Sequence, residues 1–249
     1  MDQAGLDPYH NDAVREFGRD GGGDDMALPE FADDLARLDW VAANLYSAVL
    51  SDACDAAGRR DRALRHDVRP LDEARVLVGR AKTVVWAPTF HIPERPYDQE
   101  IAAVDSLKPG EAFVMAVGRS EQIVPWGELL STATLARGGR GAVLDGLVRD
   151  SARIKAMGLP VFCTGRRPYD SCGRGAVVAY DVPVAIDGVE VHPGDLVFGD
   201  ADGVVVVPRA VEDEVLGRAW TKVAGEDTTR DALRAGRTLG DVYREHGVL

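Results

Sequence analysis

Two acids and one arginine, Glu128, Arg149 and Asp150, are the residues of this sequence best suited to chemistry. Twenty residues separate Glu128 from Arg149, about the length of one helix followed by one strand. A helix that leaves a loop and a strand that returns toward it would bring the three side chains into one pocket. Carboxylates bind divalent cations, and the planar guanidinium of arginine binds carboxylate or carbonyl oxygens. The spacing therefore predicts a divalent cation that holds a small oxyanion.

The first of these elements is a helix expected over 126–137, after Pro125 and before the terminating pair Gly138-Gly139. The first backbone amides of a helix have no intrahelical acceptor and lie at the positive end of its dipole. Such an end can bind a carboxylate or phosphate oxygen without a basic side chain. Glu128, at the same end, has two interpretations: it complements the dipole, or it holds a metal ion or a water molecule.

The Arg149-Asp150 pair follows a short apolar strand expected over 142–145 and precedes a helix expected over 151–158. In open α/β sheets, ligands bind at the carboxyl ends of strands. Asp150 is therefore either the N-cap of that helix or a ligand of Mg²⁺, which favours carboxylate and water oxygens. Arg149 is either a surface residue or the group that holds a 2-oxo acid beside the metal. Asp145 is a candidate for a residue that orients Arg149 without contacting the metal or the 2-oxo acid itself.

The remaining motifs favour structural roles. The acidic turn at 200–203 has a DxDG pattern but lacks the further ligands of an EF-hand, and His192 precedes a Pro-Gly turn. The five histidines show no metal-ligand spacing, and no P-loop, GxSxG or strand-linked GxGxxG motif occurs. The three cysteines form no CxxC or Cys/His cluster, which predicts neither a disulfide framework nor a zinc site and fits a reducing cytoplasm.

Bulk properties narrow the class of protein. With 249 residues and 45% apolar content, the chain can bury one substantial core. A net charge of -12 without a Lys/Arg block argues against a nucleic-acid surface. No apolar stretch approaches the roughly 20 residues that cross a bilayer, and the N-terminus lacks the pattern of a secretory signal. We expect a soluble cytoplasmic protein with no membrane partner.

The order of the elements predicts an α/β domain. Residues 1–27 are expected to be a flexible extension with a short helix around Val14–Phe17, and 28–249 a single domain with a C-terminal helical tail. The expected helices cover 28–58, 96–107, 126–137, 151–158 and 209–224, the last followed by a charged helical tail. The expected strands cover 75–88, 112–117, 142–145, 159–163, 176–186, 189–191, 196–199 and 204–207. The β-α-β-α-β alternation predicts a partly parallel sheet with right-handed crossovers.

Linked segments between about residues 38 and 210 are similar to those of one family. They are LYSAVLSDACDAAG, the RPL of 69–71 with VGRAKTV, WGELLSTATLARGGRGAVLDGLVRD, MGLPVF and PVAIDGVEVHPGDLVFGDADGVVVVP. The sequence resembles the RraA-like family, which includes the 4-hydroxy-4-methyl-2-oxoglutarate/4-carboxy-4-hydroxy-2-oxoadipate aldolases and the regulator of ribonuclease activity A. The resemblance implies an α/β/β/α sandwich, here with a helical N-terminal extension. It also implies a homotrimer or a dimer of trimers with active sites at subunit interfaces.

The resemblance also implies roles for the residues of the opening motif. Aldolases of the family carry an acid, twenty residues and then Arg-Asp. Asp150 would bind Mg²⁺ or Mn²⁺ largely through water, with Glu128 as the second acid, and Arg149 would contact the 2-oxo oxygen of a pyruvyl group. The amides at the helix start would receive the carboxylate of that group. The substrate-binding positions implied in this way are Gly127, Leu129, Leu130 and Arg149.

Two features depart from the aldolase pattern. Glu128 stands where the pattern usually has aspartate, and it reaches about one methylene further, which would alter the water shell of the metal or the pocket. The stretch His91–Asp98 (HIPERPYD) looks like an insertion and could remodel the mouth of the pocket.

The leading functional hypothesis is a class II, metal-dependent lyase that cleaves a carbon–carbon bond of a 2-oxo acid. Retro-aldol cleavage and oxaloacetate-type decarboxylation would share one pyruvate enolate. The base of the aldol reaction is expected to be a water of the cation oriented by Glu128, or an acid of a neighbouring subunit. The alternatives are a non-catalytic, protein-binding regulator of an RNA-processing enzyme and a specialised biosynthetic lyase with another substrate.

Overall fold

The computed structural model describes residues 26–247 of the chain. The expected flexible extension therefore lies outside the described residues except for Met26 and Ala27, and the helix expected around Val14–Phe17 lies wholly outside them. Met26 already contacts the body of the protein, because its amide donates to Thr221 Oγ1 at 2.6 Å.

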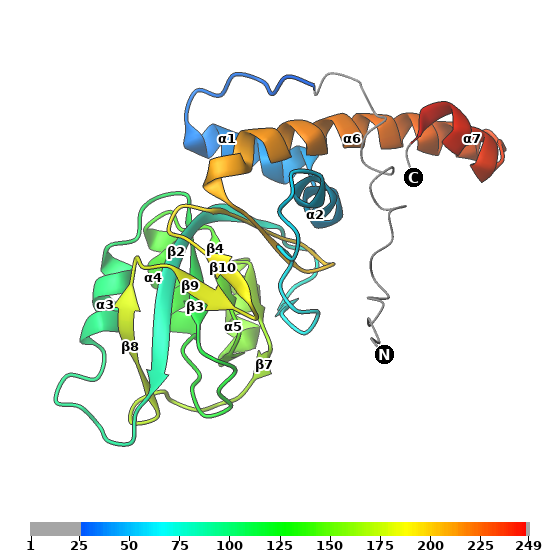
Figure 1. Ribbon diagram of the computed structural model, residues 1–249. Helices are drawn as coiled ribbons and strands as arrows, with labels where there is room; N and C mark the ends of the chain where they lie inside the picture. Colours follow the sequence, from blue (N-terminus) through cyan, green and yellow to red (C-terminus); the bar gives the residue numbers. More distant parts are fainter. Residues whose placement is uncertain (1–25, 248–249) are drawn as a thin grey trace, which may run out of the picture.

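Helices and strands alternate through the middle of the chain as the sequence predicts (Figure 1). The helices are α1 (Asp34–Asn44), α2 (Ser47–Ala56), α3 (Asp98–Asp105), α4 (Glu128–Ala136), α5 (Ser151–Met157), α6 (Glu212–Arg234, after the 3-10 turn Arg209–Val211) and α7 (Leu239–His246). The strands of the large sheet are β1 (Arg69–Pro70), β2 (Leu77–Pro88), β3 (Glu111–Ala116), β4 (Gly141–Leu144), β6 (Val161–Cys163), β8 (Gly175–Tyr180), β11 (Leu196–Gly199) and β12 (Val204–Val207). Two small pairs are β5 (Leu147–Val148) with β7 (Gly165–Arg166), and β9 (Val184–Ile186) with β10 (Val189–Val191).

The long strand β2 joins the two halves of the main sheet, whose order is β1-β6-β4-β3-β2-β11-β12. On one side β2, β3, β4 and β6 run parallel, which confirms the partly parallel sheet. On the other side β11 and β12 form an antiparallel pair, and β11 lies against the start of β2 at Leu77–Arg80. The far end of β2 pairs with β8. Strand β2 belongs to both halves and contributes residues to all three apolar clusters. Its residues are therefore buried along almost its whole length.

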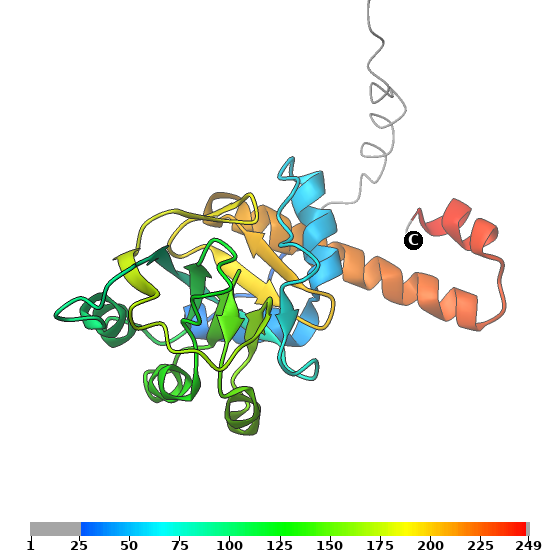
Figure 2. The same cartoon turned by 90° about the horizontal axis from the view of Figure 1, so that it is seen from below.

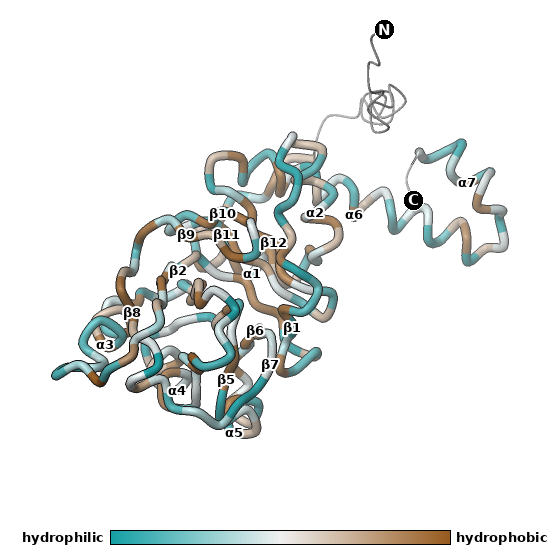
Figure 3. Tube along the Cα trace, turned by 60° about the horizontal axis from the view of Figure 1, so that its bottom comes forward, coloured by the Kyte–Doolittle hydropathy of each residue, from teal (hydrophilic) through white to brown (hydrophobic). Residues whose placement is uncertain are grey.

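Three apolar clusters fill the space between the layers. Helices α3, α4 and α5 cover the parallel half through residues such as Phe113, Leu144 and Ile154. Helices α1, α2 and α6 cover the antiparallel half on the opposite side, and the two helix groups are plainly separated in Figure 2. The third cluster lies between the strands and includes Phe162 and Val197. The hydrophobic colour of Figure 3 follows these interior strands, for example β11 and β12. The predicted α/β/β/α sandwich is confirmed.

Three predicted elements differ clearly from the structure. The helical stretch expected over 28–58 begins only at Asp34 and is divided into α1 and α2 at Leu45 and Tyr46, whose backbones are extended. The strand expected over 176–186 is divided into β8 and β9, because Asp181 has a left-handed backbone (φ 55°) and Pro183 has no amide hydrogen for a ladder. Helix α6 continues to Arg234, well beyond the expected end at Ala224. Its second half runs past the edge of the sheet (Figure 1) and carries ion pairs three and four residues apart, such as Arg230 with Asp227 and with Glu226.

None of the helices among residues 26–247 is both long enough and apolar enough to cross a membrane.

Candidate active site

A cavity of about 610 Å³ opens where α3, the start of α4 and the turn after β5 meet the loop after β7. The charged side chains at its wall include Glu100, Glu128, Arg149, Asp150, Arg167 and Asp170. The three residues predicted from the sequence therefore lie in one cavity. Gly127, Leu129 and Leu130 line it as well.

Trp126 fixes the start of α4 beside the Arg149-Asp150 turn. Its side chain is fully buried against Phe113, with 5.4 Å between the ring centroids, and its Nε1 donates to Ser131 Oγ at 2.9 Å. Its carbonyl accepts the Arg149 amide at 2.9 Å, so the main chain before α4 runs alongside β5. An anchored tryptophan thus sets the distance between the helix start and the arginine.

Gly127 is the N-cap of α4 and has room only for a hydrogen atom. A Cβ at this position would lie 2.9 Å from Asp150 Oδ2 and 3.1 Å from Arg149 Cγ, closer than carbon normally approaches. Its backbone is extended (φ -156°), so glycine is required here for space and not for conformation. The open first turn of α4 and the two charged side chains share the volume that a larger residue would fill.

Asp150 occupies the N-cap position of α5 but does not act as its cap. Its backbone is left-handed (φ 57°) and its side chain makes no hydrogen bond to the amides of α5. Instead Oδ2 accepts the amide of Glu128 at 3.3 Å, across the gap between the two helices. The N-cap interpretation is therefore wrong, because the left-handed turn directs the carboxylate to the neighbouring helix start.

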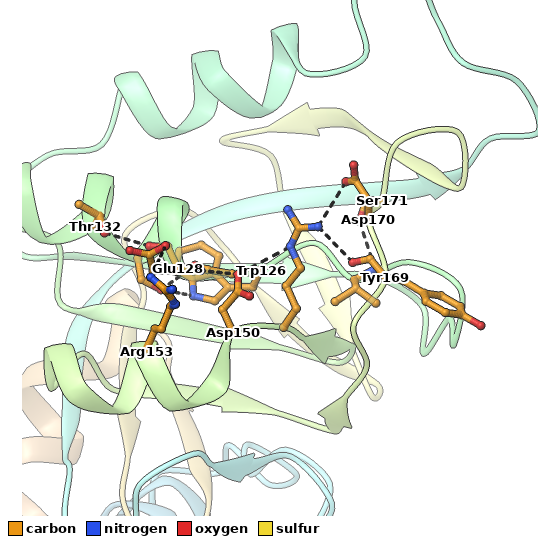
Figure 4. Close-up of polar contacts among 12 residues, drawn as sticks. Trp126, Glu128, Thr132, Asp150, Arg153, Tyr169, Asp170 and Ser171 are labelled. Atoms are coloured by element: carbon orange, nitrogen blue, oxygen red, sulfur yellow. Dashed lines mark hydrogen bonds and ion pairs between the residues drawn. The ribbon is translucent and has the colours of Figure 1, made fainter.

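Arg149 is loosely held between two carboxylates. Its Nε lies 3.8 Å from Asp150 Oδ2, and its Nη1 lies 3.7 Å from Asp170 Oδ1 and donates to the Tyr169 carbonyl at 3.4 Å. Asp150 and Asp170 lie on different sides of the site (Figure 4). The side chain of Arg149 is 40% exposed, so much of its donor capacity remains open to the cavity.

Glu128 faces the second helix of the site. Its Oε2 lies 3.9 Å from Nη1 of Arg153 on α5, and the two side chains are drawn together in Figure 4. Its main-chain amide, as noted, donates to Asp150. Glu128 and Asp150 thus stand at neighbouring helix starts, and both carboxylates line the cavity.

Asp145 does not have the role expected for it. Its buried carboxylate accepts the amides of Val117 at 2.5 Å and of Gly118 at 3.1 Å, and no contact joins it to Arg149 in the described part of the chain. Burial raises the pKa of this carboxyl, while the two amides act in the opposite direction. Asp145 therefore ties the end of β3 to the end of β4, and positions the site through the main chain.

Two acids of the cavity were missed by reasoning from sequence. Asp170 comes from the loop after β7, and Glu100 from α3. Burial raises the pKa of Glu100 to about 7; the nearby charge of Asp170 acts in the same direction and Arg149 acts against it. The only sequence signal close to Glu100 is the atypical stretch His91–Asp98, whose Tyr97 also lines the cavity.

The acids at the wall suit a hydrated cation better than a cation held by protein alone. Among residues 26–247, no group of three or more His, Cys, Asp or Glu side chains is arranged to hold a metal ion. Asp150 and Glu128 are carboxylates at an open cavity, 43% and 33% exposed. Mg²⁺ is commonly held by one or two carboxylates and keeps several waters, and Mn²⁺ suits the same oxygen donors. The donor set therefore fits either ion.

Residues 47–206 match the model of a family described as "RraA-like: Aldolase/RraA". The chain belongs to the RraA-like family. The match covers both strands and helices of the sandwich and the whole sequence from Glu128 to Asp150.

Relatives in this family carry different names. "Protein DlpA" of Legionella pneumophila is 28% identical over 215 residues, which are 86% of this chain; the match spans only 34% of DlpA. A protein of Halalkalibacterium halodurans named "Putative 4-hydroxy-4-methyl-2-oxoglutarate aldolase" is 30% identical over 201 residues, 80% of this chain and 90% of that protein.

Solved structures agree with the fold. Streptomyces coelicolor RraAS2, described as an unusual member of the RNase ES inhibitor RraA protein family, is 30% identical with a TM-score of 0.71, over 81% of this chain and 98% of that one. An uncharacterised protein of Pseudomonas syringae is 28% identical with a TM-score of 0.74, over 86% and 99% of the two chains.

Proposed function

We propose that this protein is a divalent-metal-dependent lyase that cleaves a carbon–carbon bond of a 2-oxo acid. The observation that carries the proposal is the placement of Arg149, Asp150 and Glu128 around the open start of α4 in one cavity. The aldolase name borne by a relative that matches four fifths of the chain supports the same reaction class.

Each residue of the motif has a role in this proposal. Asp150 and Glu128 would hold Mg²⁺ or Mn²⁺, in part through water molecules. A bound cation would supply Lewis-acid polarisation of the C2 carbonyl. Arg149 would donate to the 2-oxo oxygen through the guanidinium N–H groups that Asp150 and Asp170 do not use. The amides of Leu129 and Leu130, in the first turn of α4, would receive the substrate carboxylate, since a first turn has no intrahelical acceptors for them.

Cleavage between C3 and C4 of the bound acid leaves its electron pair on the pyruvyl fragment as an enolate. The positive charge of Arg149 lies where the enolate oxygen develops negative charge, which stabilises the transition state more than the substrate. Loss of CO₂ from oxaloacetate gives the same enolate. One set of residues therefore serves both aldol cleavage and decarboxylation.

The test is pyruvate release from 4-hydroxy-4-methyl-2-oxoglutarate and from oxaloacetate, with and without Mg²⁺ or Mn²⁺. We expect turnover that EDTA abolishes and that falls at least about 10³-fold in Arg149→Ala and Asp150→Asn. Arg234→Ala and Asp231→Asn, which change exposed residues on the far end of α6, serve as matched controls and should keep wild-type rates. A fully active Arg149→Ala protein would rule the assignment out.

The second candidate function is a non-catalytic regulator that binds an RNA-processing enzyme. The structural similarity to RraAS2, a member of an RNase-inhibitor family, favours it. Inhibition of a ribonuclease by the purified chain, equal in wild type and Arg149→Ala, together with no metal-dependent turnover, is the result that would establish this alternative.

We also propose that the chain assembles as a homotrimer or a dimer of trimers that places the sites at subunit interfaces. Apolar side chains near the cavity mouth, Ile101 on α3 and Leu129 on α4, are 54% and 75% exposed and would be covered in such an assembly. Sedimentation equilibrium of the wild type and of Leu129→Asp tests the proposal; a monomeric wild type would refute it.

A further inference from the structure

Glu100 is an acid of the cavity for which residues 26–247 supply no hydrogen-bond or ion-pair partner. It lies on α3, a helix that packs against β8 and α4, and its side chain is half-buried at the cavity wall. Within the described part of the chain, no hydrogen bond or ion pair satisfies its carboxylate. An unpaired carboxylate that is partly removed from water costs free energy unless it takes up a proton.

The other acids of the cavity have partners. Asp170 accepts the Tyr97 hydroxyl and the Cys172 amide, each at 3.3 Å, and faces Arg149. Asp150 accepts the Glu128 amide and faces the other end of the same guanidinium. Glu128 faces Arg153. Glu100 is thus the acid of this cavity that hydrogen bonds and ion pairs do not hold in its charged form.

The element that carries Glu100 differs from those that carry the metal-binding acids. Asp150 lies at the Nε end of the guanidinium and Asp170 at the Nη1 end. Glu100 reaches the same cavity from α3, whereas Glu128 and Asp150 come from the starts of α4 and α5. A substrate held by Arg149 in this cavity would meet Glu100 on an element separate from those that carry the metal-binding acids.

The surroundings also set when Glu100 carries a proton. Burial, then the charge of Asp170, raises its pKa to about 7, against the opposing effect of Arg149. Of the elements packed against α3, β8 brings Tyr180 and α4 brings Glu128 as titratable groups, while Tyr97 precedes α3 itself. A carboxyl group that gains and loses a proton near neutral pH suits a general acid–base.

Resting on the lyase function proposed above, we infer that Glu100 is the residue that moves the proton in aldol cleavage. The Glu100 carboxylate takes the proton of the C4 hydroxyl. The electron pair of the broken O–H bond forms the C4 carbonyl, the C3–C4 bond breaks, and its electron pair becomes the enolate of pyruvate. The protonated Glu100 then returns the proton to C3, which gives pyruvate and restores the carboxylate. No oxidant or further reactant is needed.

Decarboxylation offers the discriminating measurement, because loss of CO₂ from oxaloacetate involves no hydroxyl proton. Glu100→Gln should lower kcat for 4-hydroxy-4-methyl-2-oxoglutarate about 10²- to 10³-fold. The same variant should lower kcat for oxaloacetate decarboxylation by less than about 5-fold, since the residue is not required to break that bond. Glu100→Asp should recover part of the aldolase rate.

The pH profile gives a second readout. Wild-type kcat/KM for aldol cleavage should fall below a pH near 7, where Glu100 of the free protein becomes protonated, and the residual activity of Glu100→Gln should lack this acid limb. Glu73→Gln, an exposed glutamate outside the cavity, is the matched control and should keep both rates and the profile. Thermal unfolding of each variant verifies that it is folded.

The outcomes separate the two proposals. If the wild type releases pyruvate from neither substrate with Mg²⁺ or Mn²⁺, the lyase function fails and the inference fails with it. If the wild type is active and Glu100→Gln keeps its aldolase rate and acid limb, the inference alone fails. An equal loss of both reactions in a folded Glu100→Gln protein would also overturn it, because a residue that only shapes the cavity would give that result.

Discussion

Arg80 and Arg149 each stand between two carboxylates, yet the two clusters have opposite characters. Arg80 of β2 is 8% exposed and bonds to Asp34 of α1 and Glu212 of α6 through its whole guanidinium; Nε donates to Asp34 Oδ2 at 2.8 Å and Nη2 to Glu212 Oε1 at 3.0 Å. Arg149 is 40% exposed, and its carboxylates lie 3.7 and 3.8 Å away.

An arginine between two carboxylates thus suits a structural role when the carboxylates accept most of its hydrogen bonds. It suits a ligand-binding role when many of its donors stay open. The two carboxylates around Arg80 accept four of its five N–H donors where α1 and α6 meet the sheet, and the guanidinium itself is buried, so it has little left to offer a ligand. Around Arg149, long contacts at an open cavity hold the guanidinium in place without using up its donors. Long ion-pair distances and unused donors in an exposed charged cluster therefore indicate a place where a ligand can bind.

Removal of the buried Arg80 should have the largest effect on stability. Arg80→Ala removes one partner of the buried Glu212, which keeps its contact with Arg37, and the ion pair of the half-exposed Asp34; we expect the free energy of unfolding to fall by about 3 kcal/mol, the lower end of the range for a broken buried pair. Arg149→Ala should cost less than about 1 kcal/mol, because its contacts are exposed and long. Urea denaturation of both variants measures the contrast; equal losses would show that the two clusters are alike.

The space at Gly127 tests whether the open cluster depends on its exact spacing. A methyl group here would displace Asp150 Oδ2 or the Arg149 side chain, and we expect Gly127→Ala to lose about 10²- to 10³-fold in kcat/KM. Its stability should change little, since the backbone at this residue is extended. Gly240→Ala, where a Cβ meets nothing within 4 Å, is the control for a glycine-to-alanine change outside the site and should keep wild-type turnover. Wild-type turnover in Gly127→Ala would contradict the close packing.

A change of shape at constant charge sharpens the contrast between the two arginines. Lysine keeps the positive charge but loses the planar fork, so Arg149→Lys should lose about 10²-fold in pyruvate release at unchanged stability. Arg80→Lys, by contrast, should reduce stability and leave KM for the 2-oxo acid as it is. An Arg149→Lys protein as active as the wild type would mean that charge alone matters at the open cluster.

The smallest effect concerns pH. Glu100 has a pKa of about 7 in the folded protein, above the ordinary carboxyl value near 4.5. The folded state therefore binds this proton more tightly, so the associated stability is fully present below about pH 4.5 and is lost as the pH rises through 7. In the metal-free protein, the free energy of unfolding should fall between pH 5 and pH 8 by about 2 kcal/mol less in Glu100→Gln than in the wild type, because this half-buried group no longer titrates. Denaturation at pH 5 and pH 8 measures it; parallel profiles would refute the assignment.

The part of the site closest in sequence was predictable. Glu128, Arg149 and Asp150 lie together because a helix and a strand adjacent in the chain return to the same edge, where Trp126 pairs with Val148. The Val-rich strands and the polar turns between them likewise follow from local pattern. The break near Asp181 had one local signal, Pro183, which lacks the amide hydrogen of a strand ladder, but the valine-rich sequence on both sides of it favoured a continuous strand.

The remaining acids of the cavity could not be read from the sequence. Glu100 and Asp170 approach each other because α3 packs against β8 and the loop after β7 folds over the cavity, and no periodicity encodes that docking. Asp145 and Asp150 show the other limit. Each lies next to the element expected for it, but its hydrogen-bond partner depends on the tertiary structure. The left-handed backbone at Asp150 directs its carboxylate to the Glu128 amide, and the amides of Val117 and Gly118 bind that of Asp145.

The left-handed backbone at Asp150 also restricts how this family member can diverge. Besides glycine, aspartate and asparagine are the residues that adopt this conformation most readily, whereas branched and bulky side chains are strained in it. Asn or Gly at 150 would therefore keep the turn and the fold while removing the carboxylate. Under the proposed function, such a replacement in a relative would mark the loss of the metal-binding group without a change of architecture.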